Sequence, residues 1–287
     1  MSGQEIFTFV IEYLQRACNY TLGQIALVFG PAIVFGFLTQ YLSQKIRVEG
    51  WARFGDFYTY FTAPGTALHE FGHVVFAKLF GHEVTEVCWF GPKDGTLGYV
   101  NHSYNPESRF QQIGNLFIGT GPIWVGTLAI VLLSFLVLGP EKLDALGVSV
   151  AREQSFSSFG EALAYAGDVA AAGCSLFFDA FSVETLKNPL TLVCLYLIFC
   201  IGAHMRLSPP DVRHCGVPAL MLLGFIFLFN LCTAWLGDFS MKITYALTQY
   251  NHVVYSLLVF TLLMMLLVWA LTLVVSIFLK RKPDARF

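Results

Sequence analysis

The sequence predicts an α-helical polytopic membrane protein with about six transmembrane segments and a small β-hairpin. Of its 287 residues, 56% are hydrophobic and only 13% are charged, whereas ordinary soluble domains carry about 25% charged residues. Several charge-free stretches are long enough to cross a bilayer as helices. The net charge of −2 provides no basic surface for nucleic acid. The expected surroundings are therefore a lipid bilayer, and no nucleic-acid partner is expected.

The first predicted unit, residues 1–56, combines an interfacial helix with the first transmembrane segment. Apolar side chains recur at helical spacing in residues 1–20, as is typical of a helix lying in the membrane interface. Residues 17–44 carry no charge and are long enough to span, with Pro31 as a site for a kink. Residues 45–56 are more polar and are expected to form a connection.

The second unit, residues 57–215, is predicted to be the membrane core. It begins with a helix over residues 57–80, although Pro64 and Gly65 can break this helix, so that it starts near Thr66 instead.

A hairpin is expected to follow that helix. Strand-like segments at His82–Phe90 and Thr96–Ser103 flank the residues Gly91-Pro92-Lys93-Asp94-Gly95, and this pattern predicts a β-hairpin with an Asp-Gly turn.

The rest of this unit contains two further apolar spans. Residues 110–140 are charge-free and predict a transmembrane helix entered through Gly119-Thr120-Gly121-Pro122. Residues 141–187 are more polar and acidic, and are expected to form an extracytoplasmic connection or small subdomain. Residues 188–205 form an apolar span that leads into Ser208-Pro209-Pro210-Asp211.

The third unit, residues 216–287, is predicted to hold two transmembrane segments and a basic tail. Apolar spans cover residues 214–237 and 253–279, and Lys280-Arg281-Lys282 follows. Basic residues favour the cytoplasmic side, which predicts a cytoplasmic C-terminus and places residues 238–252 in an outside loop. The same count places residues 45–56 outside despite their basic residues, which conflicts with the rule. A prokaryotic plasma membrane is the expected location.

The segment His69-Glu70-Phe71-Gly72-His73 carries the chemistry. On a helix, His69 and His73 project from one face, where two imidazoles can bind Zn²⁺ and Glu70 can act as general base on a water held by the metal. Ionisable groups within a bilayer are costly, which favours a functional role. The alternatives are two hydrogen-bonded core histidines and a Glu70 that pairs with Lys78.

A hydrolytic zinc site usually has three protein ligands and an open position for water. Asp211 is the first candidate for the third ligand, because it ends an apolar span expected on the same side of the membrane as His73. His204 is the alternative, either as the ligand or as a group that contacts one. Asp211 can also be explained as a residue that ends the turn after Pro210.

Residues 66–74 resemble the zinc-binding motif of the site-2 proteases, which are intramembrane zinc metalloproteases. The resemblance covers roughly residues 57–215 and includes the hairpin, the Gly121-Pro122 helix and the later span with its prolines and Asp211. Two features of the second motif are absent, namely the asparagine before the prolines and a glycine after Asp211. The segment 141–187 is also short for the PDZ domain of many members.

The resemblance implies a zinc-dependent endopeptidase that cleaves a membrane-protein substrate in or near a transmembrane segment. It implies Glu70 as the catalytic residue and His69, His73 and Asp211 as the zinc ligands. The alternative is a non-proteolytic membrane protein, either a metal-handling transporter or a helix-binding scaffold, that uses the same histidines.

Overall fold

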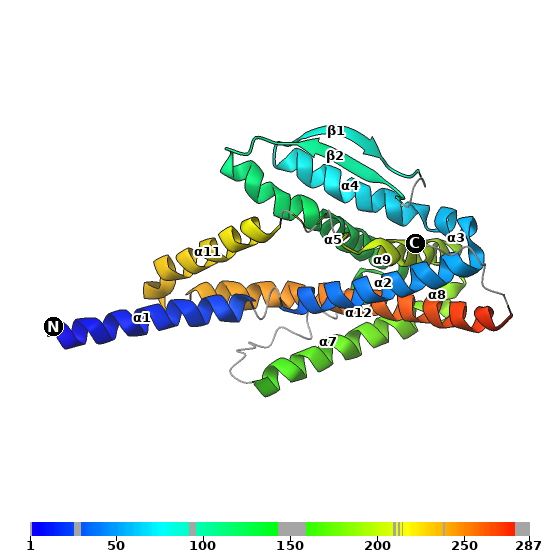
Figure 1. Cartoon of the computed structure of the whole chain (residues 1–287). Helices are drawn as coiled ribbons and strands as arrows, with labels where there is room; N and C mark the ends of the chain where they lie inside the picture. The colour runs from blue at the N-terminus through cyan, green and yellow to red at the C-terminus, as the bar shows by residue number, and fades with distance from the viewer. Residues whose placement is uncertain are drawn as a thin grey trace.

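The computed structural model describes residues 2–25, 30–91, 96–142, 159–208, 211, 213, 215–237 and 239–278. The described chain is mostly helical and contains one two-stranded antiparallel hairpin (Figure 1). The predicted helical class and the predicted hairpin after the histidine-bearing helix are therefore confirmed.

The elements follow one another in a simple order. They are α1 (Gly3–Gln24), α2 (Gly30–Phe54), α3 (Asp56–Phe61), α4 (Ala63–Leu79), β1 (Glu83–Cys88), β2 (Tyr99–Ser103), α5 (Arg109–Leu138), α7 (Phe159–Ala180), α8 (Val183–Leu186), α9 (Pro189–His204), α11 (Gly216–Thr233), the 3₁₀ turn η2 (Ala234–Leu236) and α12 (Phe239–Phe278).

Three helical segments of the described chain are long and apolar enough to cross a membrane. They are Arg109–Leu138, Gly216–Leu236 and Asn251–Phe278. The apolar helix α9 is shorter, at 16 residues. The structure thus supports a membrane protein with at least these three candidate spans.

The helix α4 lies between α5 and α9 at distances that only glycine permits. A Cβ atom on Gly72 would lie 2.7 Å from the Cα of Pro122 on α5, and one on Gly121 would lie 2.6 Å from the carbonyl oxygen of Gly72. On the other side, a Cβ on Gly65 would lie 2.0 Å from the carbonyl oxygen of Cys200 on α9. Small residues allow membrane helices to approach backbone to backbone, and here they hold α4 against both neighbours.

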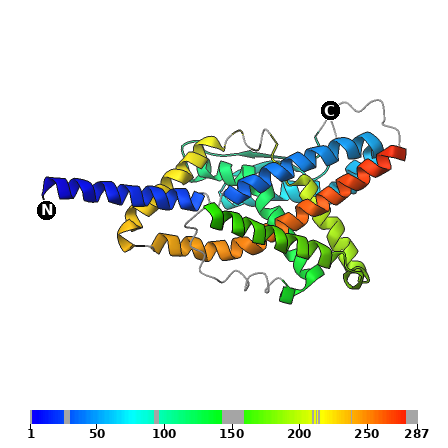
Figure 2. The same cartoon turned by 90° about the horizontal axis from the view of Figure 1, so that it is seen from below.

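The long helix α12 organises the second layer of the molecule. It runs beside α2 and α7 (Figures 1 and 2) and contributes several of the most buried side chains, including Phe260, Leu257 and Met265. From α7, Gly173 approaches α12 so closely that a Cβ there would lie 2.5 Å from the Cβ of Val259. The apolar core joins these helices to α9 and α5.

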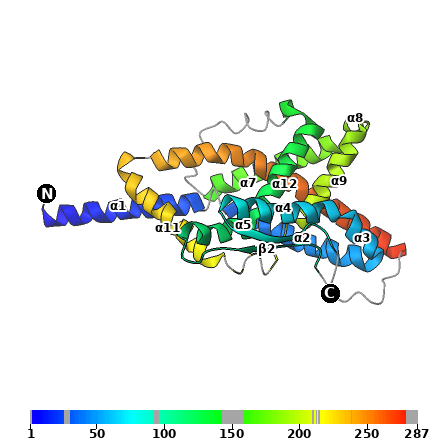
Figure 3. The ribbon, with the colours of Figure 1, turned by 90° about the horizontal axis from the view of Figure 1, so that it is seen from above.

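The hairpin covers the outer side of α4 and the start of α5 (Figures 1 and 3). Its register pairs Glu83 with Ser103 and Cys88 with Tyr99, with an irregularity between Val84 and Glu86. The expected turn residues 92–95 lie outside the described residues.

Two expected connections are helical. Residues 45–54 continue α2, where Glu49 and Arg53 form an ion pair at 3.5 Å with the i,i+4 spacing that stabilises helices. Residues 239–252, expected as an outside loop, form the start of α12. The expected helix boundaries were wrong at both places because polar residues were taken to end a helix, whereas the side of the membrane for residues 238–252 stays a prediction.

Other boundaries also differ from expectation. The stretch 17–44, expected as one span, is divided between α1 and α2, with residues 26–29 outside the described part. The helix 57–80 is broken at Thr62, and Pro64 lies in the first turn of α4, where a missing N–H costs nothing. Gly119–Pro122 lies inside α5 rather than at its start. Most of the described part of 141–187 is the helix α7, which packs on α12.

The Gly121→Ala variant is expected to lower the free energy of unfolding by about 1–3 kcal/mol. The added methyl group would meet the backbone of α4, which cannot move aside as a side chain can. The measurement is chemical unfolding of the purified protein in detergent. The matched control is Gly224→Ala on α11, where a Cβ meets nothing within 4 Å. Equal losses for the two variants would contradict the role assigned to this contact.

Candidate metal centre

Three side chains that can bind a metal come together at the centre of the fold. His69 and His73 lie one turn apart on α4, and Asp211 reaches them from the connection between α9 and α11. Their ligand atoms all lie within 4.8 Å of one another. The Nε2 atom of His73 is 3.2 Å from the Nε2 of His69 and 3.3 Å from Oδ1 of Asp211. This group could hold a metal ion.

Backbone carbonyl groups orient both imidazoles. The Nδ1 atom of His69 lies 2.8 Å from the carbonyl oxygen of His204, and that of His73 lies 2.8 Å from the carbonyl oxygen of Ile118. A carbonyl oxygen only accepts hydrogen bonds, so each Nδ1 carries the hydrogen. In the neutral rings the lone pair is then on Nε2, the atom that faces the other ligands.

The aspartate is oriented by the backbone as well. The N–H of Ser208 donates a hydrogen bond to Oδ2 of Asp211. A Cβ on Gly119 would lie 2.0 Å from the carbonyl oxygen of Asp211, so the connection passes directly over α5 at this glycine. The carboxylate is thus held in place from two sides.

The spacing of the ligand atoms, which is independent of the sequence motif, also fits a tetrahedral metal ion. With both rings neutral, two Nε2 lone pairs and a carboxylate oxygen converge, and their mutual repulsion is relieved either by a metal ion or by a proton on Nε2 of His73, which lies 3.3 Å from Asp211. Ligand atoms of a tetrahedral zinc ion lie about 3.3 Å apart. The two short separations match this value, whereas the distance of 3.9 Å from His69 Nε2 to Asp211 Oδ2 is longer.

Glu70 lies beside this group but is not part of it. It is only 6% exposed, yet the described residues give its side chain no hydrogen bond and no ion pair. The alternative pairing with Lys78 is therefore not seen. A Cβ on Gly98 would lie 3.0 Å from Oε1 of Glu70, so the chain next to β2 closes over this carboxylate.

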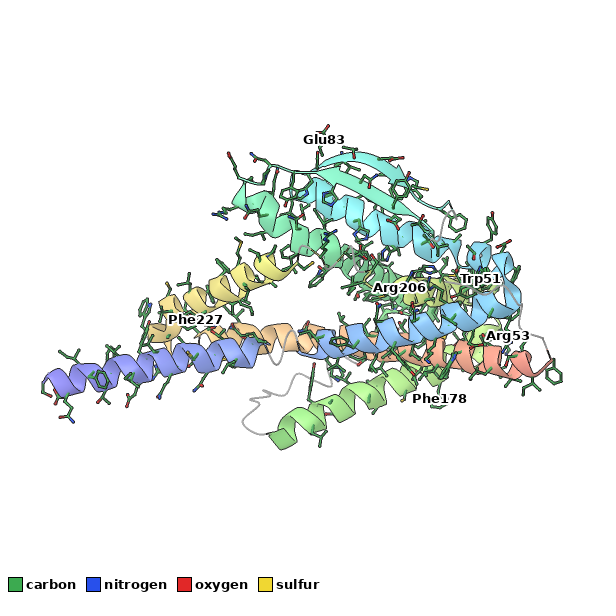
Figure 4. The ribbon with its side chains drawn as sticks, in the orientation of Figure 1. Trp51, Arg53, Glu83, Phe178, Arg206 and Phe227 are labelled. Carbon is green, nitrogen blue, oxygen red and sulfur yellow. The ribbon has the colours of Figure 1, made fainter. Side chains whose placement is uncertain are left out.

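A cavity of about 730 Å³ joins Glu70 to the three ligands. Its walls come from α4, from α5, from the hairpin segment that includes residues 96–102, and from the connection after α9. Among the cavity residues, Asn101 and Asn115 carry amide groups and Arg206 carries a guanidinium group that can donate hydrogen bonds. In Figure 4, Arg206 lies among the helices, whereas Glu83 on the hairpin and Phe178 on α7 point outward.

His204, the alternative third ligand, does not belong to the three-residue group. Its ring Nδ1 lies 3.0 Å from the carbonyl oxygen of Cys200, and only its backbone carbonyl contacts His69. Sequence reasoning missed Ile118, Gly98 and the cavity role of Arg206. Backbone contacts of this kind leave no residue-type signal, apart from the glycines that permit them.

Replacing Asp211 should weaken zinc binding without affecting the histidines. Removing a group that contacts a metal ligand typically lowers metal affinity about 10–100-fold. Asp211→Ala removes a proposed ligand itself, so we expect its loss of zinc affinity to be larger. The measurement is zinc content of the purified protein by elemental analysis. His204→Gln is the control and should retain wild-type zinc, since the carbonyl that contacts His69 remains. Zinc loss in the control alone would make His204 the ligand.

The described residues thus place around one cavity a buried His73, the partly buried His69 and Asp211, and a buried Glu70 whose side chain has no hydrogen bond or ion pair within the described part of the chain. Comparison with models of known protein families, with curated proteins and with solved structures gave no match to this chain.

Proposed function

We propose that this chain is a zinc-dependent intramembrane endopeptidase similar to the site-2 proteases. The observation that carries the proposal is the juxtaposition of an unpaired, buried Glu70 with the His69, His73 and Asp211 group in one cavity. The presence of candidate membrane-spanning helices supports a substrate that lies within the bilayer.

The proposed metal ligands are His69, His73 and Asp211. Zinc bound by such a set supplies Lewis-acid chemistry, activating water and polarising a carbonyl group. The two carbonyl groups that receive the Nδ1 hydrogens keep both Nε2 lone pairs directed into the site. Three protein ligands leave a position open for reactants.

Glu70 is proposed as the general base. Its position next to the ligand group allows it to take a proton from the attacking water, and it can then deliver that proton to the departing amine nitrogen. A carboxylate can do this only if it is not committed to another partner, and the described residues provide no such partner. The amide of Asn115 and the guanidinium of Arg206 can donate hydrogen bonds to oxygens of the bound substrate.

The hairpin is proposed to present the substrate. A transmembrane helix hides its carbonyl groups in internal hydrogen bonds, so it must be extended before hydrolysis. β2 is paired only with β1 in the described sheet, and its residues line the cavity. An extended substrate segment can add to such a strand by backbone hydrogen bonds.

The membrane arrangement is proposed to include more spans than the three helical candidates. The units 1–56, 57–215 and 216–287 would supply about six segments in total, with α2, α4 and α9 in addition to the three candidates. The C-terminus is proposed to be cytoplasmic, and the membrane to be the plasma membrane of a prokaryote. The proposed cytoplasmic C-terminus rests on the basic residues Lys280-Arg281-Lys282.

The Glu70→Gln variant tests the enzymatic proposal. We expect zinc content to be unchanged and zinc-dependent cleavage of single-span membrane proteins in liposomes to fall by about 10²–10⁴-fold, because the base is lost while the ligands remain. Glu184→Gln on the exposed helix α8 is the matched control and should cleave normally.

Two results would contradict the proposal. One is a zinc-loaded wild-type protein that cleaves nothing in a broad panel of membrane helices. The other is zinc transport into liposomes that survives Glu70→Gln, which would favour the metal-handling alternative.

A further inference from the structure

The helix α5 contains a proline in its interior, at the place where it contacts α4. In an α-helix, the carbonyl of residue 118 accepts a hydrogen bond from the N–H of residue 122. Residue 122 is Pro122, which has no N–H. The carbonyl of Ile118 therefore lacks its usual helical partner.

The donor that replaces it is a proposed metal ligand. The Nδ1 atom of His73 lies 2.8 Å from the carbonyl oxygen of Ile118. Ile118 is 4% exposed and His73 is 7% exposed, so water does not readily replace either group. A buried carbonyl without a partner is unfavourable. Pro122 leaves the Ile118 carbonyl without a helical hydrogen-bond donor, and His73 supplies that donor.

The packing of α4 on α5 brings the two groups into range. A Cβ on Gly72 would lie 2.7 Å from both the Cα and the N of Pro122. Gly72 immediately precedes His73, so the contact between the two backbones sets the position of the imidazole. The same residues that bring the helices together therefore also deliver Nδ1 to the Ile118 carbonyl.

The Nδ1 hydrogen of His69 is accepted by a carbonyl that is free for a different reason. His69 donates to the carbonyl of His204, the last residue of α9, and a carbonyl at a helix end has no helical partner. In the middle of a regular helix as long as the 30-residue α5, every carbonyl would have a helical partner. A proline four residues later is the means of freeing one there.

We propose that Pro122 is a positioning residue for the metal ligand His73. Because it lacks an N–H, it leaves the Ile118 carbonyl to accept the Nδ1 hydrogen, and this fixes the tautomer and directs Nε2 to the metal. The inference rests on the metal site of the proposed function but not on proteolysis.

Restoring a backbone N–H at position 122 should weaken the hydrogen bond between His73 and the Ile118 carbonyl rather than abolish it. A carbonyl oxygen has two lone pairs, so a backbone N–H at position 122 would share Ile118 with His73 rather than displace it completely. Loss of a hydrogen bond to a metal-binding histidine typically lowers metal affinity 10–100-fold.

The test compares two replacements of Pro122 in the full-length purified protein. Pro122→Ala introduces an N–H, whereas incorporation of lactic acid at position 122 gives the same methyl side chain with an ester oxygen and no N–H. The zinc dissociation constant is measured by competition with a chelator, and the unfolding temperature is measured without zinc. Pro218→Ala on α11 controls for removal of a proline elsewhere in the chain.

We expect Pro122→Ala to bind zinc up to about 10-fold more weakly, the lower end of the range for complete loss of such a hydrogen bond, while its zinc-free form unfolds at the same or a higher temperature. The lactic acid variant and Pro218→Ala should bind zinc as the wild type does.

Equal zinc affinity in all variants would overturn the proposal, and so would an equal loss in the alanine and lactic acid variants, which would assign the effect to the proline ring. A wild type that binds no zinc would overturn both this inference and the proposed metal site. A zinc-binding wild type without proteolysis would overturn only the enzymatic proposal.

Discussion

The close approach of α4 to its two neighbours is the constraint on which the rest of the site depends. Gly65 faces the backbone of α9 and Gly72 faces that of α5, in both cases at distances that exclude a side chain. These contacts bring the carbonyl groups of His204 and Ile118 to the two imidazoles. A wider separation would leave the histidines on α4 but remove the groups that orient them. The orientation of the two imidazoles thus depends on Gly65 and Gly72, which have no side chains.

The electrostatic balance of the cavity follows from this geometry. Both Nδ1 hydrogens are used by backbone carbonyls, and Oδ2 of Asp211 receives the N–H of Ser208. When both imidazoles are neutral, the remaining atoms at the centre are acceptors, which favours a cation among them. Glu70 adds a further carboxylate at the edge of the same cavity. The atoms of His69, His73 and Asp211 are held by backbone groups, whereas the Glu70 carboxylate has no hydrogen-bond partner among the described residues. The proposed roles of ligands and general base are divided in the same way.

Sequence reasoning predicted the parts of the molecule that depend on local pattern. The helical class, the hairpin after α4, and the grouping of His69, His73 and Asp211 all follow from apolar stretches, strand composition and spacing. It failed where polar residues occur within helices, as at 45–54, where an ion pair between neighbouring turns supports the helix. The residues of α7 were interpreted as part of a connection or small subdomain, because contact with α12 is not visible in a local pattern.

The orienting groups of the metal centre were out of reach for a more basic reason. Every residue has a carbonyl group, so the type of residue 118 or 204 says nothing about its role as an acceptor. Besides the glycines, Pro122 was an available signal, and it was taken as part of the entry to a helix rather than as an interior residue. Recognising it requires the length of α5 and its position against α4.

The length of α12 has a consequence for the way the molecule sits in lipid. At 1.5 Å per residue, its 40 residues extend for about 60 Å, and the 28-residue apolar part covers about 42 Å, against a hydrocarbon layer of about 30 Å. Such hydrophobic mismatch is relieved mainly by tilting or by local thickening of the bilayer. Because α12 packs directly on α2 and α7, its inclination is shared with them. If α12 crosses a bilayer, the thickness of that bilayer would therefore act on the helix layer that underlies the candidate metal centre.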